Sequence, residues 1–302
     1  MTQKDIPNCF LPVTQLIEKL KKGGLSSLEL IEEYLERIRK YDRNLGAFID
    51  VYGEEARKAA AASDMARASG HIIGPLQGIP VAVKDIIDIE GKITTGGSMV
   101  WKDRRSTLTA TLVRRMVEAG MIVLGKTHTV EFAMGSFGTN QHMGSPKNPW
   151  DLEDHRATGG SSAGTAAAVA AGLSPWGIGT DTGGSVRIPS AWCGLTGLKT
   201  SVGRISTHGV LPLSHTLDTP GPMCRSVEDA AILYRILAGP DEQDSRTVIH
   251  SVEDPFPELK KGISGFKLAR VPDSELENVD SENLEAYENS LKNLEKLGAS
   301  IH

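Results

Sequence analysis

Short apolar runs alternate with helix-like segments through the middle of the chain, and this alternation constrains the fold more than any other feature. Residues 78–87 (GIPVAVKDII) and 121–127 (MIVLGKT) are rich in Val and Ile, which predicts buried strands. The amphipathic segment 109–120 lies between them, and the Ala-rich segment 164–172 precedes another apolar run at 176–181 (WGIGTD). We therefore predict an α/β fold with a mixed central β-sheet that is covered on both faces by α-helices.

The regions on either side are predicted to be mainly helical. Ser26 and Glu29 fit a capping box. Apolar residues recur at helical spacing just after it, at Leu28, Ile31, Leu35 and Ile38. Further elements are predicted as helices over 54–69, 227–239 and 282–297, and as a strand over 266–271. Because the chain stops at GASIH, where an α/β pattern begins its next strand, we expect one domain over 1–302, with a helical segment 1–70 and an α/β core 71–302 that is incomplete at its C-terminus.

Composition and charge exclude several classes of protein. The 302 residues include 33 basic and 38 acidic side chains, a net charge of −5, which argues against nucleic acid as the main partner. With 39% hydrophobic residues, the chain has enough apolar surface to fold. No run of about 18 apolar residues occurs and MTQKDIPNCF is not a secretory signal, so we expect neither a membrane span nor secretion. The cysteines Cys9, Cys193 and Cys224 form no CxxC pair, which predicts reduced thiols in a cytoplasmic protein without disulfides or zinc.

Two glycine–serine segments are the candidates for chemistry, TGGSSAGTAAAVAAG (158–172) and GTDTGGSVRIPSAWCG (179–194). A glycine-rich turn that leads into a helix exposes backbone N–H groups, which can bind a phosphate or a transition-state oxyanion. Neither nucleotide motif is complete, because Thr165 stands where a P-loop requires Lys and Thr182 where a dinucleotide fingerprint requires its third Gly.

Two readings of the serines remain, each with an alternative. Gly160–Gly164 fits GxSxG with Ser162 as the nucleophile, but no apolar strand precedes it, as the α/β-hydrolase elbow requires. Acyl transfer by a serine with a lysine base is the other reading, and Lys84 in the buried run VAVKDII could be kept neutral by burial. Residue types alone favour a structural ion pair of Lys84 with Asp85, Asp88 or another carboxylate, and they allow tight turns equally well as the reason for the glycines.

Taken together, the lysine of GIPVAVKD, the segment GGSSAG and the segment GTDTGGSVRIPSAWCG resemble the amidase signature family. The resemblance extends from the helical N-terminus through 217–231 (LDTPGPMCRSVEDAA). It implies the amidase signature fold and a Ser–cis-Ser–Lys triad in which Ser185 is the nucleophile, Ser161 the bridging serine and Lys84 the base. The bridging serine of the family follows a cis peptide bond, which here is Gly160–Ser161.

The resemblance also implies an oxyanion hole and a substrate-binding segment. Backbone N–H groups of Thr182, Gly183, Gly184 and Ser185 are expected to stabilise the oxyanion. The loops around the site set specificity in the family, and within EFAMGSFGTN (131–140) we expect Met134 and Gly135 to contact substrate.

Other polar residues near the two segments have two possible roles or none in the chemistry. Asp181 and Arg187 flank the nucleophile, either to orient its loop or as a buried ion pair unrelated to chemistry. No cofactor or metal is implied, although His128, His142 and His155 lie near the site in sequence.

The chain departs from the family pattern in two respects. Ala163 and Thr165 replace the second Gly–Ser pair of the usual GGSSGGS, and family members continue well beyond residue 302. Both replacements are small, so they need not change the chemistry. The shorter length affects what the resemblance implies about the stability of the chain and about its substrate specificity.

Three functions follow. The first is a free-standing amidase acting on a small-molecule amide, with no nucleic acid and no membrane as partners, and compatible with a homodimer. The second is the amidase subunit of a glutamine-dependent aminoacyl-tRNA amidotransferase, which usually has a glutamine at or next to the position of Ile188, after Arg187. The third is an inactive truncated homologue with a binding role.

Overall fold

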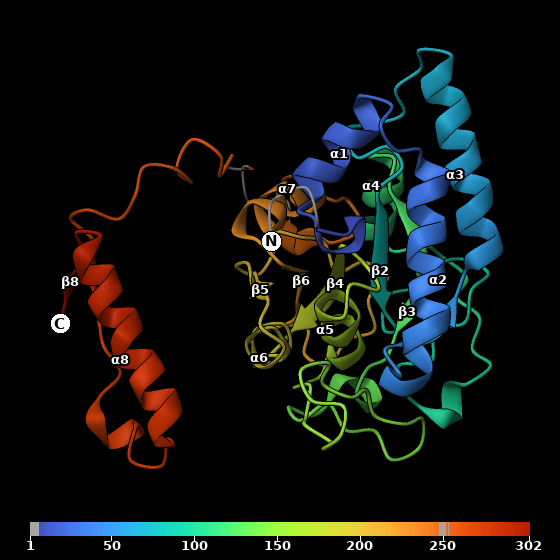
Figure 1. The fold of residues 1–302 in the computed structure, drawn as a ribbon. Helices are drawn as coiled ribbons and strands as arrows, with labels where there is room; N and C mark the ends of the chain where they lie inside the picture. Colours follow the sequence, from blue (N-terminus) through green and yellow to red (C-terminus); the bar gives the residue numbers. More distant parts are fainter. Residues whose placement is uncertain (1–5, 248–251, 253) are drawn as a thin grey trace. The chain divides into compact units, whose positions relative to one another are not determined.

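The computed structural model describes residues 6–247, 252 and 254–302, which form two compact units, Met1–Val252 and Glu253–His302 (Figure 1). The assignment of one domain to the whole chain stays a prediction. The first five residues, which begin the segment MTQKDIPNCF, lie outside the described residues.

The first unit is built on a six-stranded sheet with the strand order β1-β3-β2-β4-β6-β5. Its strands are β1 (Phe48–Val51), β2 (Pro80–Lys84), β3 (Ile122–Thr127), β4 (Trp176–Asp181), β5 (Thr196–Gly197) and β6 (Thr219–Cys224). The central strand β2 pairs in parallel with β3 and β4, whereas the pairings β1–β3, β4–β6 and β5–β6 are antiparallel. The prediction of a mixed central sheet is confirmed.

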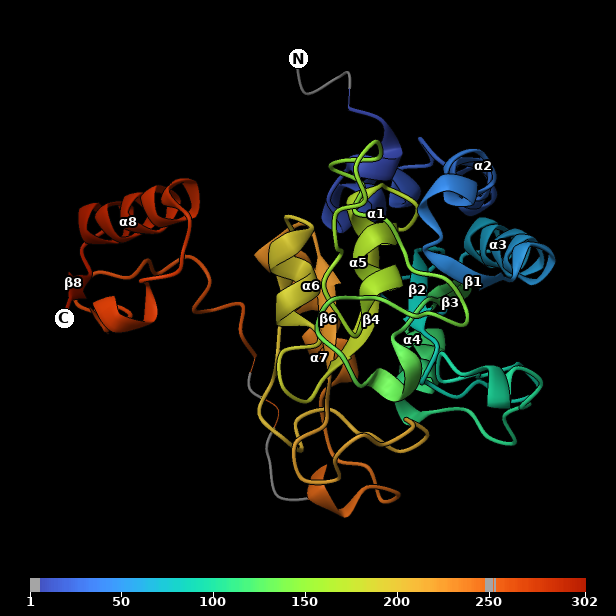
Figure 2. The same ribbon diagram turned by 90° about the horizontal axis from the view of Figure 1, so that it is seen from below.

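Helices cover both faces of this sheet, as predicted. They are α1 (Val13–Lys21), α2 (Ser27–Leu45), α3 (Gly53–Ala68), α4 (Thr111–Glu118), α5 (Ala163–Ala170), α6 (Arg187–Trp192) and α7 (Val227–Leu237). Figure 2 shows α5 against one face, and α4 and α7 on the opposite side. Small side chains let α5 approach the sheet closely, and nearly all of its residues are buried. The predicted helices over 54–69, 109–120, 164–172 and 227–239 correspond to α3, α4, α5 and α7.

Helix α2 begins as its sequence predicts. Ser26 accepts a hydrogen bond from the N–H of Glu29, whose side chain accepts from the N–H of Ser26 in return, which completes the capping box. Ile31, Leu35 and Ile38 are buried on its apolar stripe, but Leu28 is 38% exposed. The predicted helical spacing is confirmed for all four residues, with Leu28 in the first turn of α2 and outside its buried stripe.

Strand β6 was not predicted, because Pro220 and Pro222 interrupt its pattern. The carbonyl of Pro222 accepts from the N–H of Leu198, so this residue faces β5. In an antiparallel ladder the N and C=O of one residue point to the same side. Both proline nitrogens therefore face the side where β5 pairs only with Met223 and Cys224, and no ladder hydrogen bond to β4 is lost.

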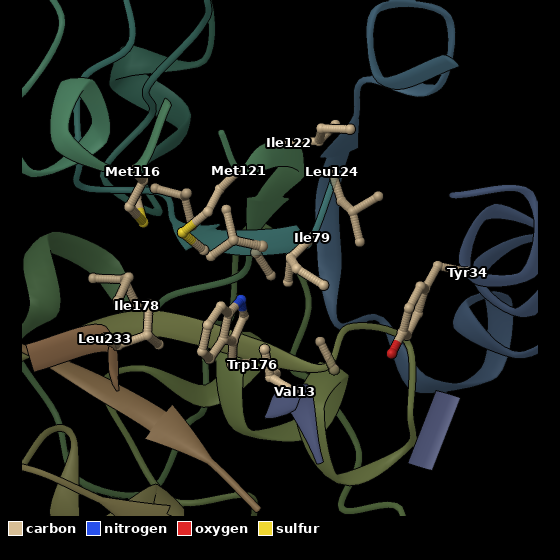
Figure 3. Packing of buried hydrophobic residues seen from close by; sticks show 14 of the residues in the cluster. Val13, Tyr34, Ile79, Met116, Met121, Ile122, Leu124, Trp176, Ile178 and Leu233 are labelled. Carbon is tan, nitrogen blue, oxygen red and sulfur yellow. The ribbon is translucent and has the colours of Figure 1, made fainter. Parts of the chain in front are cut away.

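The apolar core joins this sheet to its helices (Figure 3). Trp176 is fully buried, and its Nε1 donates to the carbonyl of Pro80 at 2.9 Å, which links β4 to β2. Ile178 of the same strand points toward Leu233 of α7 in Figure 3. Strand β2 thus lies between two neighbouring strands, with every one of its residues buried.

The second unit contains helix α8 (Ser281–Lys296) and a parallel pair of two-residue strands, β7 (Lys267–Leu268) and β8 (Ser300–Ile301). The predicted helix over 282–297 and the predicted strand within 266–271 are both present, the strand in shorter form. The next strand was expected to begin at GASIH, and β8 lies within those residues. Within the described residues, no helix of the chain is long and apolar enough to cross a membrane.

Candidate active site

Lys84 is the last residue of β2, and its side chain is completely buried. Its Nζ lies 2.7 Å from Ser161 Oγ and 2.8 Å from Thr180 Oγ1. The alternative of an ion pair with a neighbouring aspartate is wrong, because Asp85 pairs with Lys126 and Asp88 with Arg104. Among the described residues no carboxylate forms an ion pair with Lys84.

Burial lowers the pKa of Lys84 from 10.5 to about 7, although the charges of Asp181 and Asp218 partly oppose this effect. An ammonium group loses its hydration inside the protein, and the two hydroxyl partners carry no compensating charge. A substantial fraction of Lys84 is therefore a neutral amine near pH 7, which can accept a proton.

Ser161 is fully buried, and its backbone is held from several sides. The peptide bond Gly160–Ser161 is cis, as the family resemblance implies. The carbonyl of Ser161 accepts from the N–H of Val130 at 3.2 Å and from the hydroxyl of Thr129 at 3.1 Å. The N–H of Gly160 donates to the carbonyl of Ser136 at 2.6 Å. These contacts fix the hydroxyl that lies beside Lys84.

Ser185 lies in the turn between β4 and α6, next to the first glycine–serine segment. Its carbonyl accepts from the N–H of Ser162 at 3.3 Å, which joins the two segments. The hydroxyl of Ser162 is buried against the backbone of Thr180, with its oxygen 3.3 Å from both the N and the O of that residue. The prediction that no strand precedes Ser162 is confirmed, so the structure offers no nucleophile elbow there.

Asp181 organises the turn that carries Ser185. Its buried carboxylate accepts from the N–H groups of Gly184 at 2.8 Å and Val186 at 3.1 Å, and from the guanidinium of Arg187 at 2.9 Å. Burial alone would raise the pKa of Asp181, but the hydrogen bonds from Arg187 and the backbone hold it below its ordinary value. The ion pair of Asp181 and Arg187 therefore orients the loop, which was one of the two readings of these residues.

The expected oxyanion donors are not equivalent in the structure. The N–H of Gly184 is occupied by Asp181, which corrects the expectation that it faces an oxyanion. Within the described part of the chain, no protein group accepts from the N–H groups of Thr182, Gly183 or Ser185. Gly183 is exposed, and a Cβ at that position would meet no atom within 4 Å. Three of the four expected donors are thus free to bind a ligand oxygen.

The segment around Met134 and Gly135 lies against the first glycine–serine turn. A Cβ on Gly160 would lie only 2.7 Å from the carbonyl oxygen of Gly135. Met134 is 71% exposed, and the nearby ring of Phe137 packs at 5.9 Å from that of Trp192. The structure therefore places exposed apolar side chains on the segment expected to contact substrate.

Two partners of the site were missed in the sequence. The hydroxyl of Thr180 accepts a hydrogen bond from the Lys84 amine. The sequence signal that could have identified Thr180 is a polar residue inside an apolar strand. Asp218 accepts from the hydroxyl of Thr182 at 2.5 Å and from the N–H groups of Leu213 and Ser214. No signal marks Asp218, because its contact joins segments far apart in the chain.

The three histidines near the site in sequence are not brought together as ligands. His128 is buried with its Nε2 at 2.9 Å from the carbonyl of Met143, whereas His142 and His155 are exposed. The described residues contain no group of three or more side chains that could hold a metal ion.

Comparisons with known proteins identify the family. The Amidase family profile matches residues 29–302, so the chain belongs to the amidase signature family. The glutamyl-tRNA(Gln) amidotransferase A subunit of Chromohalobacter salexigens is 43% identical over 289 residues, which are 96% of this chain and 59% of that protein. The corresponding protein of Halorhodospira halophila is 42% identical with the same coverage.

Solved structures agree with this assignment. The chain resembles the peptide amidase of Stenotrophomonas maltophilia with a TM-score of 0.87 and 36% identity, covering 96% of this chain and 61% of that one. It resembles the glutamyl-tRNA(Gln) amidotransferase A subunit of Thermotoga maritima with a TM-score of 0.84 and 36% identity, covering 98% and 62%. The chain therefore spans about 60% of the length of the relatives it matches.

Proposed function

We propose that this chain cleaves the carbon–nitrogen bond of carboxylic amides through an acyl-enzyme on Ser185. The observation that carries the proposal is the fully buried Lys84 amine, which lies 2.7 Å from Ser161 and has a pKa of about 7. A serine hydroxyl is a poor nucleophile by itself and needs a neighbouring base. The neutral Lys84 amine supplies that base, and Ser161 carries the proton between it and Ser185.

The reaction proceeds in two balanced halves. Ser185 Oγ bonds to the amide carbon while its proton passes to Ser161, whose own proton passes to Lys84. The relay then returns a proton to the departing nitrogen as the C–N bond breaks. Water attacks the acyl-enzyme by the same route and releases the carboxylic acid. The free N–H groups of Thr182, Gly183 and Ser185 would stabilise the oxyanion in both halves.

A second candidate is the amidase subunit of a glutamine-dependent aminoacyl-tRNA amidotransferase. Its support is that relatives 41–43% identical to this chain are named as the A subunits of glutamyl-tRNA(Gln) amidotransferases. In that function the ammonia released from glutamine would pass to partner subunits that hold the charged tRNA. Ile188 stands against it, because such subunits usually have glutamine there or at a neighbouring position.

Fluorophosphonate labelling of the purified chain, followed by peptide mapping, tests the proposal. We expect the label on Ser185 and expect it to disappear in Lys84→Ala, because the serine then lacks its base. Label on Ser162 would contradict the proposal and favour the hydrolase elbow. A folded chain that takes no label would favour an inactive homologue with a binding role.

The two candidate functions then separate by substrate. A chain that releases ammonia or amines from small amides without partners supports the free-standing amidase. Ammonia release from glutamine that depends on added amidotransferase subunits supports the second candidate.

A further inference from the structure

A second lysine, Lys126 on β3, is as deeply buried as Lys84 but lies outside the proposed triad. Its Nζ lies 3.3 Å from Asp85 Oδ1 and donates to Thr94 Oγ1 at 2.8 Å and to the carbonyl of Ile87 at 2.6 Å. Burial lowers the pKa of Lys126 and raises that of Asp85. Because removing two charges from water offsets much of their attraction, stability alone is a weak reason for such a pair.

Asp85 directly follows Lys84, and its contacts fix the end of β2. Its N–H donates to the carbonyl of Thr127 at 3.0 Å, which extends the pairing with β3. Its Oδ2 accepts from the N–H of Thr95 at 3.0 Å and from the hydroxyl of Thr95 at 2.5 Å, and its carbonyl accepts from the N–H of Gly96 at 2.9 Å. Successive side chains of a strand point to opposite faces, so this carboxylate anchors a loop without approaching the Lys84 amine.

The anchored loop, residues 94–97, continues the connection toward the serines. Thr95 Oγ1 accepts from the N–H of Gly97 at 2.9 Å, and the carbonyl of Gly97 accepts from Asn140 Nδ2 at 2.7 Å. The same Nδ2 donates to the carbonyl of Thr129 at 3.2 Å. A Cβ on Gly97 would lie 2.7 Å from that carbonyl oxygen, so the loop and the Thr129 segment are in close backbone contact.

The Thr129 segment in turn holds Ser161. The hydroxyl of Thr129 and the N–H of Val130 both donate to the carbonyl of Ser161, at 3.1 and 3.2 Å. The side chain of the same serine lies 2.7 Å from Lys84 Nζ. One network of hydrogen bonds therefore begins at the residue after Lys84 and ends at Ser161.

We propose that Asp85, Lys126 and Thr95 are positioning residues that set the distance between Lys84 and Ser161. The inference rests on the proposed function, in which a proton passes between these two side chains. Proton transfer needs donor and acceptor atoms about 2.6–3.2 Å apart. A misplacement of about 1 Å can cost on the order of 100-fold in rate, so a loosened network should slow the relay.

Thr95→Val tests the proposal, because it keeps the shape of the side chain and removes the hydroxyl that joins Asp85 to Gly97. Thr95→Ser keeps that hydroxyl. The measurement is the second-order rate of Ser185 modification by a fluorophosphonate, per folded molecule of the full chain, between pH 6 and 9. We expect T95V to react about tenfold more slowly or worse at every pH, and T95S to react within about threefold of the wild type.

Thr247→Val is the matched control. Thr247 is also buried, and among the described residues its hydroxyl bonds only to the backbones of Asp241 and Asp244. We expect T247V to lose stability and to keep the wild-type labelling rate. A T95V chain that labels like T247V overturns the positioning role, while labelling of the wild type at Ser185 would still support the proposed function. A wild type without label overturns both.

If T95V does not fold, Thr129→Val tests the other end of the network. This change removes the hydroxyl that donates to the carbonyl of Ser161. The proposal expects the same loss of labelling rate, and a T129V chain that reacts at the wild-type rate overturns it.

Discussion

Replacing Lys84 with Met is expected to abolish amide cleavage and to change how the stability of the first unit depends on pH. Burial holds the pKa of Lys84 at about 7 in the folded chain, against its ordinary value of 10.5. Unfolding returns the side chain to water and to the ordinary pKa. Between these two values the unfolded chain binds the extra proton, so the wild type becomes more stable as the pH rises. Met has a similar length and no charge, and therefore removes this dependence.

The size of the effect follows from the two pKa values. Below pH 7 both states are protonated, and the difference of 3.5 between 10.5 and 7 corresponds to a cost of about 5 kcal/mol for burying the ammonium. At pH 7 half of the folded chains hold the neutral amine and the cost is about 4 kcal/mol, whereas at pH 9 nearly all of them do and the cost is about 2 kcal/mol. From pH 7 to 9 the wild type should therefore gain about 2 kcal/mol relative to Lys84→Met. Met also leaves the hydroxyls of Ser161 and Thr180 without their amine partner, at about 1–3 kcal/mol each, but this loss is the same at both pH values.

Urea unfolding followed by tryptophan fluorescence measures this difference. All four tryptophans, Trp101, Trp150, Trp176 and Trp192, belong to the first unit, so the signal reports that unit alone. Lys126→Met strands the buried carboxylate of Asp85 and should destabilise the fold by about 3–5 kcal/mol. If the free energies of unfolding of wild type and Lys84→Met differ by a constant amount from pH 7 to 9, Lys84 does not have a lowered pKa and the assignment of the base fails.

Four further outcomes are expected. Ser185→Ala should abolish turnover while leaving the circular dichroism spectrum unchanged, and near-normal amide hydrolysis by this variant would exclude Ser185 as nucleophile. The value of kcat/KM for amide hydrolysis should fall about tenfold per pH unit below a midpoint near pH 7, because Lys84 becomes protonated. A flat profile from pH 5 to 9 would exclude a lysine base. Asp181→Asn should slow fluorophosphonate labelling about tenfold or more, because the turn that carries Ser185 loses its charged acceptor. An unchanged rate would show that this turn keeps its conformation without the Asp181 charge. Trp176→Phe removes the hydrogen bond from the indole Nε1 to the Pro80 carbonyl. It should lower the free energy of unfolding by about 1–3 kcal/mol, as measured by circular dichroism in urea.

The sequence predicted best those elements whose residues carry their own periodicity. β4 was predicted over 176–181 as found, from the short run WGIGTD, and the structure buries all six of these residues. β6 was missed because its signal is not local. A strand with two prolines is stable here only because its proline nitrogens face the side where β5 is short, and that depends on the sheet order.

The candidate site was predictable only in part for the same reason. The pattern singled out Lys84 and the two glycine–serine segments, but it left an ion pair with Asp85 open as an alternative. Only the structure shows which carboxylates are occupied by other cations. The roles of Asp218 and of the Gly184 N–H depend on contacts between separate segments, which residue spacing alone does not determine.

The state of Lys84 is decided by the sheet rather than by its neighbours in sequence. Parallel strands on both sides of β2 exclude water from Lys84, which disfavours the ammonium form. Strand alternation directs the carboxylate of Asp85 to the other face, where Lys126 pairs with it. Thr180 and Ser161 then satisfy the amine with hydroxyls, which do not require it to be charged. A lysine placed between two parallel strands and given only hydroxyl partners is therefore available as a base, and the same lysine moved one residue along the strand would face Lys126 and lose the relay.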